Sequence, residues 1–292
     1  MIIKKANECS GDILLKLSQR NIIDCEVCGC AHMHPLPTAD ELKKFYENDY
    51  SESTPSPNYA DKFETINELI VEKKPPRILE IGAWDGAQLQ YFLDGGWDCV
   101  GIEPSLQKSI IAQKRGVKVI QKMFQEVRED ELGTFDAINL SFVLEHVNDP
   151  GQFLKRISEK LIKKNGIICI EVPNDYSLLQ KAAKLKLNLK DYWVCDPDHV
   201  NYFNVDSLKK FVKKYDFEPV LVEASFPMEM FLLFGENYVD DPKVGKACHQ
   251  KRLSFEEALS AIGENGLKRK LYQKMAELGI GRSIMLFARK LG

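Results

Sequence analysis

A short stretch with two acids and two glycines, residues 78–86, has the residue types of a turn that binds a small ligand. It reads Ile-Leu-Glu-Ile-Gly-Ala-Trp-Asp-Gly, and the apolar residues before Gly82 are typical of a buried parallel strand. Glycines at 82 and 86 would let the backbone approach a ligand closely before a helix begins. Because Glu80 and Asp85 have no Lys or Arg beside them in the sequence, the turn should repel a pyrophosphate and favour a ligand with a cationic end.

A further acid, Glu103, lies 21 residues beyond Gly82, directly after the apolar run 99–102. In a doubly wound sheet, an acid at this position points at the ribose hydroxyls of a bound nucleoside. The two stretches resemble motifs I and II of the class I S-adenosylmethionine-dependent methyltransferases, with Trp84 where that family commonly has its second glycine. The cofactor of that family carries a sulfonium, an ammonium and a ribose. The resemblance implies that this cofactor is bound by Glu80, Gly82, Ala83, Trp84, Asp85, Gly86, Glu103, Pro104, Met123, Phe124, Ser141 and Phe142.

Two further segments, 142–150 and 196–203, resemble the acceptor side of small-molecule and sugar methyltransferases. Methyl transfer from a sulfonium is an in-line displacement, and a hydroxyl acceptor reacts faster beside a positioned base, for which His is the best-matched side chain. Of the five histidines, His146 and His199 follow predicted strands. We expect His199 to be the base; a structural hydrogen bond from His199 to a neighbouring loop is the alternative. The residues expected to orient it or to shape the acceptor pocket are Asp198 or Asp196, Glu145 and His146.

Four of the eight cysteines lie in the first 30 residues. Cys25-Glu-Val-Cys28-Gly29 is a knuckle that can place two thiolates on one metal ion, and Cys9 lies upstream. With the Pro-Leu-Pro and the aromatic residues that follow, this segment resembles the zinc-ribbon leader of many bacterial methyltransferases. The resemblance implies one structural zinc held by Cys9, Cys25 and Cys28, with a fourth ligand from Cys30, His32 or His34. A short hairpin without metal is the alternative.

The composition is that of an ordinary globular protein. The 292 residues are 44% hydrophobic and 28% charged, with a formal charge of −3, so nothing points to nucleic acid or to an anionic membrane surface. The first residues lack the apolar core of a signal peptide, and no apolar stretch is long enough to span a bilayer. Eight cysteines in such a chain favour reduced thiols and a cytoplasmic location.

Apolar runs alternate with helical patterns from residue 78 to 172, which is typical of a parallel sheet covered by helices. The expected strands are 78–82, 98–102, 117–120, 135–141, 166–172, 218–223 and 282–289. The predicted fold class is α/β, a Rossmann-like doubly wound seven-stranded sheet, and the family resemblance makes its last strand antiparallel. The expected domains are a leader at 1–37, a helical lead-in at 38–77, and a methyltransferase domain at 78–292 with a helical insert at 225–280.

Helices are expected outside the central alternation as well. Their ranges are 38–50 (capped by Thr38), 59–72, 177–189, 205–214, 254–262 and 267–278. Residues 51–58 should be a mobile connection or a lid hinge. The apolar segment 226–234 should pack over the substrate cleft or against a second subunit, which leaves a homodimer open.

These patterns predict an S-adenosylmethionine-dependent methyltransferase that acts on a small molecule. The resemblance favours a sugar or a nucleotide-linked sugar of surface polysaccharide biosynthesis as acceptor. One alternative is a non-catalytic scaffold of the same fold that uses the cysteine unit and the insert to bind partners. Another is a nicotinamide-dependent oxidoreductase, which the missing glycine and the acidic turn disfavour.

Overall fold

The computed structural model describes residues 9–48, 59–70, 75–262 and 265–292, so the expected hinge at 51–58 lies outside the described residues. The chain forms two compact units. Unit 1 contains Met1–Phe45, Val172–Phe211 and Leu221–Leu286, and unit 2 contains Tyr46–Glu171, Val212–Val220 and Phe287–Gly292.

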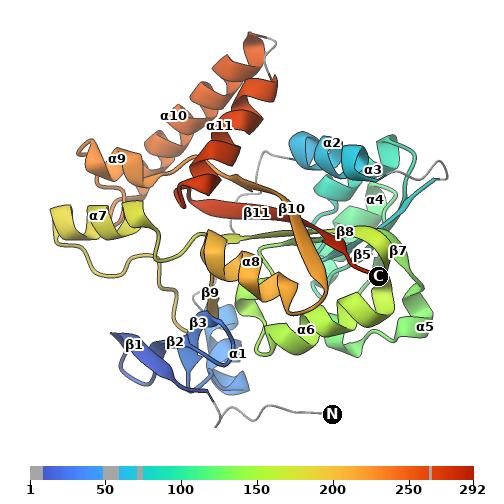
Figure 1. Cartoon of the computed structure of the whole chain (residues 1–292), viewed down its shortest axis with the longest axis horizontal. Helices are drawn as coiled ribbons and strands as arrows, with labels where there is room; N and C mark the ends of the chain where they lie inside the picture. The colour runs from blue at the N-terminus through green and yellow to red at the C-terminus, as the bar shows by residue number, and fades with distance from the viewer. Residues whose placement is uncertain (1–8, 49–58, 71–74, 263–264) are drawn as a thin grey trace. The chain divides into compact units, whose positions relative to one another are not determined.

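A seven-stranded sheet confirms the predicted fold class (Figure 1). Its strands are β4 (Arg77–Ile81), β5 (Asp98–Ile102), β6 (Lys118–Ile120), β7 (Phe135–Ser141), β8 (Ile162–Pro173), β10 (Phe217–Ala224) and β11 (Ser283–Lys290). Their order is β10-β11-β8-β7-β4-β5-β6, with β4 to β8 parallel and β11 antiparallel. The carboxyl ends of β4, β5, β7 and β8 therefore lie along one edge, where ligands bind in such sheets.

The central strands are apolar on both faces because helices cover both. The helices and helical turns of unit 2 are α2 (Tyr59–Leu69), α3 (Ala87–Asp94), α4 (Leu106–Lys114), η1 (Phe124–Glu126), α5 (Glu129–Leu132), η2 (Leu144–His146), α6 (Pro150–Arg156) and η3 (Ile157–Leu161). Ile78, Leu79, Ile138 and Ile168 are fully buried in β4, β7 and β8. Ser105 and Asp149 cap α4 and α6 by accepting backbone N–H groups, which fixes where these helices begin.

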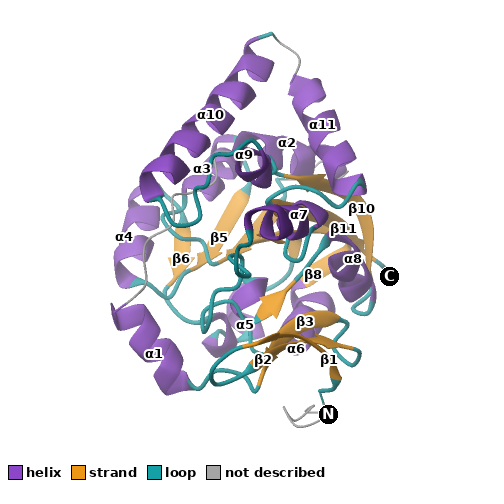
Figure 2. Cartoon of the chain, turned by 90° about the vertical axis from the view of Figure 1, so that its left-hand side faces the viewer, coloured by secondary structure: helices purple, strands orange, loops and turns teal. Residues whose placement is uncertain are grey.

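A second, four-stranded sheet lies within unit 1 (Figure 2). Its strands are β1 (Gly11–Lys16), β2 (Asn21–Cys25), β3 (Cys30–His34) and β9 (Asn201–Tyr202), and β9 pairs antiparallel with β3. Its apolar cluster is small: Ile22, Ala31, Met33 and Tyr202. The sheet thus takes a strand, and a core residue, from far along the chain.

Helix α1 (Ala39–Asn48) follows this sheet and begins at the predicted cap. The hydroxyl of Thr38 accepts the Glu41 backbone N–H at 3.2 Å, and the Glu41 carboxylate accepts the Thr38 backbone N–H at 2.7 Å. This reciprocal pair is the capping box that the sequence predicts.

The other helices with residues in unit 1 are α7 (Leu178–Leu187), α8 (Val205–Lys213), α9 (Glu229–Leu233), α10 (Pro242–Ala261) and α11 (Asn265–Glu277). Helices α10 and α11 lie side by side (Figures 1 and 2), and the Tyr272 hydroxyl donates to Glu256 between them at 2.7 Å. The prediction that the first of these helices begins at 254 is wrong. Asp241 caps a helix that starts at Pro242, a cap-and-proline signal that the apolar periodicity does not reveal.

The apolar segment 226–234 is covered largely by its own unit. The Phe226 ring lies 5.5 Å from that of Phe231 and 5.6 Å from that of Phe255, and Leu232 is fully buried. Within the segment only Phe234 is exposed, at 77%. None of the helices in the described parts of the chain is long and apolar enough to cross a membrane.

Candidate cofactor site and candidate metal centre

The turn after β4 is held in a conformation that requires its glycines. Gly82 and Gly86 have φ values of +77° and +76°, in the left-handed region. The backbone N–H groups of Gly82 and Ala83 both donate to the carbonyl oxygen of Ile102 in β5. A Cβ atom at Gly86 would lie 2.8 Å from the Cβ of Ala112 in α4. The turn is therefore packed tightly against β5 and α4.

Trp84, the departure from the family pattern, is accommodated by Glu103. Trp84 also has a left-handed φ of +48°, which is strained for a side chain of this size. Its backbone N–H donates to the Glu103 carboxylate at 2.9 Å, and the Ser105 N–H donates to the same carboxylate at 2.8 Å. Burial raises the pKa of Glu103, while these two N–H groups oppose the rise. A carboxylate has about four acceptor positions, so Glu103 keeps capacity for ribose hydroxyls.

Asp85 is paired with a cation, so the expectation that no Lys or Arg offsets it is wrong. Arg115 lies 3.0 Å from the Asp85 carboxylate and also donates to its carbonyl oxygen at 2.9 Å. Lys108 lies 4.1 Å from the centre of the Trp84 ring. Helix α4 and the residue after it bring these cations back to the turn from 24 and 30 residues along the chain, a proximity that local sequence cannot show. Asp85 also accepts the Ala87 N–H at the start of α3, so it helps to position that helix.

Glu80 differs from Asp85 in that no cation among the described residues forms an ion pair with it. Its side chain in β4 is 3% exposed, and one carboxylate oxygen accepts the Asn139 amide at 2.5 Å. The other oxygen, Oε2, has no hydrogen-bond partner among the described residues. Burial raises the pKa of Glu80 to about 7, against the opposing effects of Lys62 and Asn139. A buried carboxylate oxygen that accepts no hydrogen bond from the protein is suited to bind the ammonium group of a ligand.

Asn139 and Glu80 belong to a buried polar row that crosses three neighbouring strands. Glu80 in β4 is opposite Asn139 in β7, and Ser141 in β7 is opposite Glu171 in β8. Lys62 from α2 completes the row: its ammonium donates to the Ser141 hydroxyl at 2.6 Å and to Glu171 at 2.9 Å. Burial alone would lower the pKa of Lys62, but Glu171 outweighs this and raises it, so Lys62 is charged. We call these five residues the polar row.

Three members of the polar row, Asn139, Glu171 and Lys62, were not predicted from the sequence, although each leaves a signal in it. Asn139 and Glu171 are polar residues within the buried stretches 137–140 of β7 and 166–172 of β8, where their neighbours are apolar. Lys62 lies one helical turn before the buried Ile66, on the face of α2 that packs inward. A polar residue on a face that must be buried implies a polar partner.

The turns after β6 and β7 each present one exposed apolar side chain. Met123 is half exposed, whereas the Phe124 ring is buried 4.6 Å from that of Phe153. Phe142 is also exposed, and its N–H donates to the Glu171 carbonyl at 2.8 Å. Of the residues that the resemblance assigns to cofactor binding, Met123 and Pro104 thus lie exposed on the surface and Phe124 lies in the core.

Glu145 and His146 follow β7 on the helical turn η2. Glu145 is 1% exposed and His146 about 30% on its side chain, and the His146 Nε2 lies 3.9 Å from a Glu145 oxygen. Two residues expected to shape the acceptor pocket therefore lie beside each other.

Asp196, Asp198 and His199 lie in unit 1, on the segment that leads into β9. The His199 N–H donates to the Cys195 carbonyl at 2.9 Å, and the ring is half buried. Asp196 forms an ion pair with Arg20 at 3.0 Å, and Arg20 also pairs with Glu41. Asp196 is thus held by Arg20, which leaves Asp198 as the candidate to orient His199.

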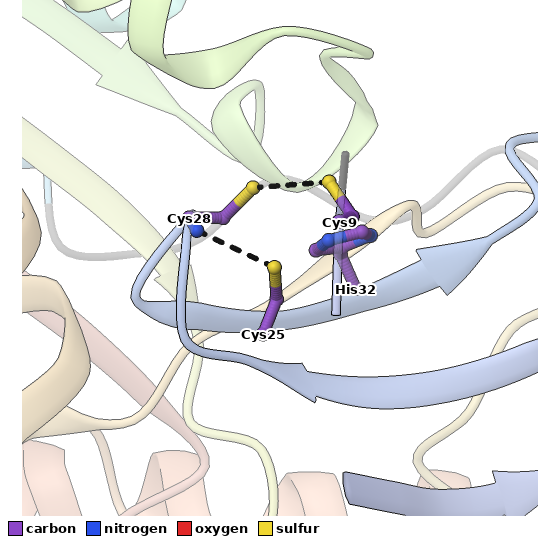
Figure 3. A group of neighbouring side chains, drawn as sticks. All are labelled: Cys9, Cys25, Cys28 and His32. Atoms are coloured by element: carbon purple, nitrogen blue, oxygen red, sulfur yellow. Dashed lines mark hydrogen bonds between the residues drawn. The ribbon is translucent and has the colours of Figure 1, made fainter. Parts of the chain in front are cut away.

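The predicted cysteine ligands come together in unit 1 with one histidine (Figure 3). Ligand atoms of Cys9, Cys25, Cys28 and His32 all lie within 4.8 Å of one another. The Cys9 and Cys28 sulfurs are 3.7 Å apart, and the Cys28 N–H donates to the Cys25 sulfur at 3.4 Å. Two thiolates about 2.3 Å from one tetrahedral zinc would lie roughly 3.8 Å apart, so the spacing fits that ion.

His32 is the fourth member that the structure places in this group. Its Nδ1 lies 2.7 Å from the carbonyl oxygen of its neighbour Met33, an arrangement in which Nδ1–H donates. This tautomer leaves a lone pair on Nε2, which has no hydrogen-bond partner in the described chain. A backbone carbonyl that orients the ring is the usual support of a metal-binding histidine.

The fold and the turn after β4 define a Rossmann-like methyltransferase. The chain belongs to the methyltransferase-domain family, whose model matches residues 57–222.

Individual relatives are more distant. A ubiquinone biosynthesis O-methyltransferase from Azorhizobium caulinodans is 33% identical over 103 residues, which is 34% of this chain and 40% of that protein. The 1,6-didemethyltoxoflavin-N1-methyltransferase of Burkholderia thailandensis, solved with bound 1,6-didemethyltoxoflavin and S-adenosylhomocysteine, has 15% identity and a TM-score of 0.52 over 97% of this chain and 100% of that one. The cyclopropane synthase MmaA2 of Mycobacterium tuberculosis has 13% identity and a TM-score of 0.51 over 83% and 87%. At these identities the two solved structures show the fold alone.

Proposed function

We propose that the protein is an S-adenosylmethionine-dependent methyltransferase that acts on a small molecule. The observation that carries the proposal is Glu80: a buried carboxylate with one oxygen lacking a partner, at the end of β4 beside a tight glycine turn. Family membership supports the same reaction. In this proposal Glu80 binds the cofactor ammonium, Glu103 binds the ribose, and Met123 covers the adenine.

The charges of the polar row favour a cationic ligand. The row holds two carboxyl groups, Glu80 and Glu171, and one ammonium, Lys62. With both acids ionised, one negative charge is left in a buried place, where an opposite charge is favoured strongly. S-adenosylmethionine carries a sulfonium, an ammonium and a carboxylate, hence one net positive charge. The pyrophosphate of a dinucleotide would add negative charge instead.

Calorimetric titration with S-adenosylhomocysteine and with NAD tests the proposal. We expect binding of S-adenosylhomocysteine near one equivalent and none of NAD. A non-catalytic scaffold should bind neither ligand, and binding of NAD alone would establish an oxidoreductase instead.

For the chemistry, we infer transfer to an acceptor hydroxyl. The bond between the methyl carbon and sulfur breaks as the acceptor oxygen bonds to that carbon, the sulfur keeps the electron pair, and His199 takes the hydroxyl proton. The A. caulinodans relative, an O-methyltransferase by name, supports oxygen as the nucleophile. A sugar or nucleotide-linked sugar acceptor is supported by the resemblance of residues 142–150 and 196–203 to sugar methyltransferases.

His199→Ala and His146→Ala test this assignment, once an acceptor has been found by incubating the protein with labelled S-adenosylmethionine and a panel of sugars and sugar nucleotides. Loss of a general base should lower turnover by about a hundredfold in His199→Ala, with affinity for S-adenosylhomocysteine changed only a few-fold. Near-normal turnover of the His199 variant would exclude it as the base.

A second proposal is that Cys9, Cys25, Cys28 and His32 hold one structural zinc. The spacing of their ligand atoms supports it, and a closed site with four protein ligands stabilises a small unit rather than activating water. Elemental analysis of protein prepared without chelator should find about one equivalent of zinc. Less than a tenth of an equivalent would leave the cluster as a group of reduced thiols.

A further inference from the structure

Each hydrogen bond in the polar row has only one possible direction. Together these bonds leave the hydroxyl proton of Ser141 without an acceptor among the described residues. Lys62 can only donate, so the Ser141 hydroxyl oxygen accepts from it. The Asn139 amide nitrogen can also only donate, and it does so to Glu80 at 2.5 Å and to the same Ser141 oxygen at 3.2 Å. Ser141 therefore accepts twice, which fills the acceptor capacity of a hydroxyl.

Two groups at this edge of the sheet then remain available to a ligand. The first is the hydroxyl proton of Ser141, for which the described residues supply no acceptor, on a side chain that is only half buried at the end of β7. The second is the bare Oε2 oxygen of Glu80. Both side chains are bonded to one nitrogen, that of Asn139, so a donor and an acceptor stand side by side.

We propose that Lys62 is a positioning residue for the amino-acid end of the cofactor: it orients Ser141 to donate to the ligand carboxylate while Glu80 accepts from the ligand ammonium. The carboxylate and ammonium of an α-amino acid are separated by one carbon, so a neighbouring donor and acceptor match them. This inference rests on the proposed function and adds a residue from α2 to it.

Lys62 acts here in two ways. Its ammonium donates to the Ser141 oxygen, which leaves that hydroxyl its proton to offer to a ligand, and it also pairs with Glu171. The Glu171 side chain is 3% exposed and is opposite Ser141 on the neighbouring strand. Without the ammonium, this carboxylate would be buried without a cation, and the Ser141 hydroxyl would be the nearest donor left to it. Ser141 would then turn its proton toward Glu171, and the cofactor carboxylate would lose its donor.

A second lysine–acid pair in the same unit provides a matched control. Lys163 lies 2.7 Å from Asp136, and Asp136 is 5% exposed and also accepts the Arg77 N–H at 2.8 Å. This pair is at the start of β7 and β8, at the edge opposite to the proposed cofactor site. Like the pair of Lys62 and Glu171, it joins a lysine to a buried acid. Unlike that pair, it makes no contact with Ser141.

The experiment measures affinity for S-adenosylhomocysteine by calorimetry and stability by urea unfolding in Lys62→Met, Lys62→Met/Glu171→Met and Lys163→Met. Lys62→Met should lose stability because it leaves a buried carboxylate unpaired. The double variant should recover that stability, since apolar side chains of similar volume often replace a buried ion pair without loss. Its affinity should nevertheless remain about tenfold or more below wild type, because the Ser141 oxygen has lost the Lys62 donor that orients its hydroxyl. Lys163→Met should stay within about twofold in affinity.

Ser141→Ala keeps the ion pair and removes only the donor, so it tests the proposal even if the methionine variants do not fold. It should also lose about tenfold or more in affinity. Wild-type affinity in Ser141→Ala, or in a stable double variant, would show that Lys62 is merely structural. If the wild-type protein itself binds no S-adenosylhomocysteine, the proposed function fails rather than this inference.

Discussion

Two turns of this protein follow a strand, contain a glycine in the left-handed region and carry candidate ligand-binding groups, yet they are stabilised differently. The turn after β4 is fixed by the protein itself: Glu103 accepts the Trp84 backbone N–H of this turn and the Ser105 N–H at the start of α4, and α4 packs against Gly86. The turn after β2, with Gly29 at a φ of +79°, places sulfur atoms of Cys9 and Cys28 3.7 Å apart without a covalent bond.

The difference shows which site needs its ligand in order to be formed. The first turn follows β4 in the central sheet, where the neighbouring strands are fully buried. Its conformation is therefore fixed before a ligand binds. The second lies on a sheet whose apolar cluster has four buried members, too few to hold a closely packed group of thiols by burial alone. We therefore expect ligand removal to change the second turn far more than the first.

The largest expected effect is on metal binding. His32→Ala should lower zinc affinity by at least about a hundredfold, because it removes one of four ligands from a closed site. His34→Ala is the matched control, since His34 lies two residues further along β3 and outside the ligand group. Competition with a chromophoric chelator measures both. Equal zinc affinity in the two variants would remove His32 from the ligand set.

The next largest effect distinguishes two acids of the candidate cofactor site, Glu103 and Asp85. Glu103→Ala should weaken binding of S-adenosylhomocysteine by about a hundredfold, because the turn loses its shared acceptor and the ribose loses its partner. Asp85→Asn should change affinity by less than about threefold, since Asp85 is half buried and is paired with Arg115. The reverse order of effects would contradict the roles assigned to these acids.

The affinity of the cofactor site for its ligand should depend on pH through Glu80. Glu80 has a pKa raised to about 7 by burial, with Lys62 and Asn139 opposing the rise and Asp85 and Glu103 adding to it. The ligand ammonium requires the ionised carboxylate, so affinity for S-adenosylhomocysteine should approach its full value about one unit above this pKa, near pH 8. Below pH 7 it should fall by up to about tenfold per unit, as a proton competes with the ligand.

Calorimetry between pH 5.5 and 8 measures this dependence. Glu80→Gln should bind weakly and with a flat profile over the same range. A flat profile in the wild-type protein would mean that Glu80 does not titrate in the free state.

The smallest effect concerns the glycines that allow such turns. Gly86→Ala should destabilise the protein by more than Gly116→Ala, although both have left-handed φ values, +76° and +89°. A Cβ at Gly116 meets nothing within 4 Å, so that variant should lose only the roughly 1–2 kcal/mol of left-handed strain. A Cβ at Gly86 must in addition displace Ala112. Urea unfolding of both variants measures the difference, and equal losses would mean that α4 yields to the extra atom.

The sequence predicts the parts of the fold that depend on local pattern. The strands of the central sheet are found to within a few residues because both of their faces are apolar, and Thr38 marks the start of α1 by its cap. The cofactor turn and the cysteine knuckle are found because their glycines and ligands are close together along the chain.

What the sequence does not predict are pairings between distant residues. Lys62 meets Ser141 and Glu171 across separations of 79 and 109 residues, and Arg115 meets Asp85 across 30. Such contacts follow from how helices pack on the sheet, which no single stretch encodes. The same holds for β9, whose two residues have no strand pattern of their own and become a strand only because β3 offers an edge.

The pairing of β3 with β9 has a consequence for truncated variants of this protein. The Met33 N–H donates to the Val200 carbonyl, His32 pairs with Asn201, and Arg20 holds Asp196, so the leader is the physical support of the segment that carries His199. A truncation placed at residue 37 would follow the apparent sequence boundary but would remove this support. For the same reason, a different leader joined to the rest of the chain would have to offer an equivalent strand edge to residues 201–202.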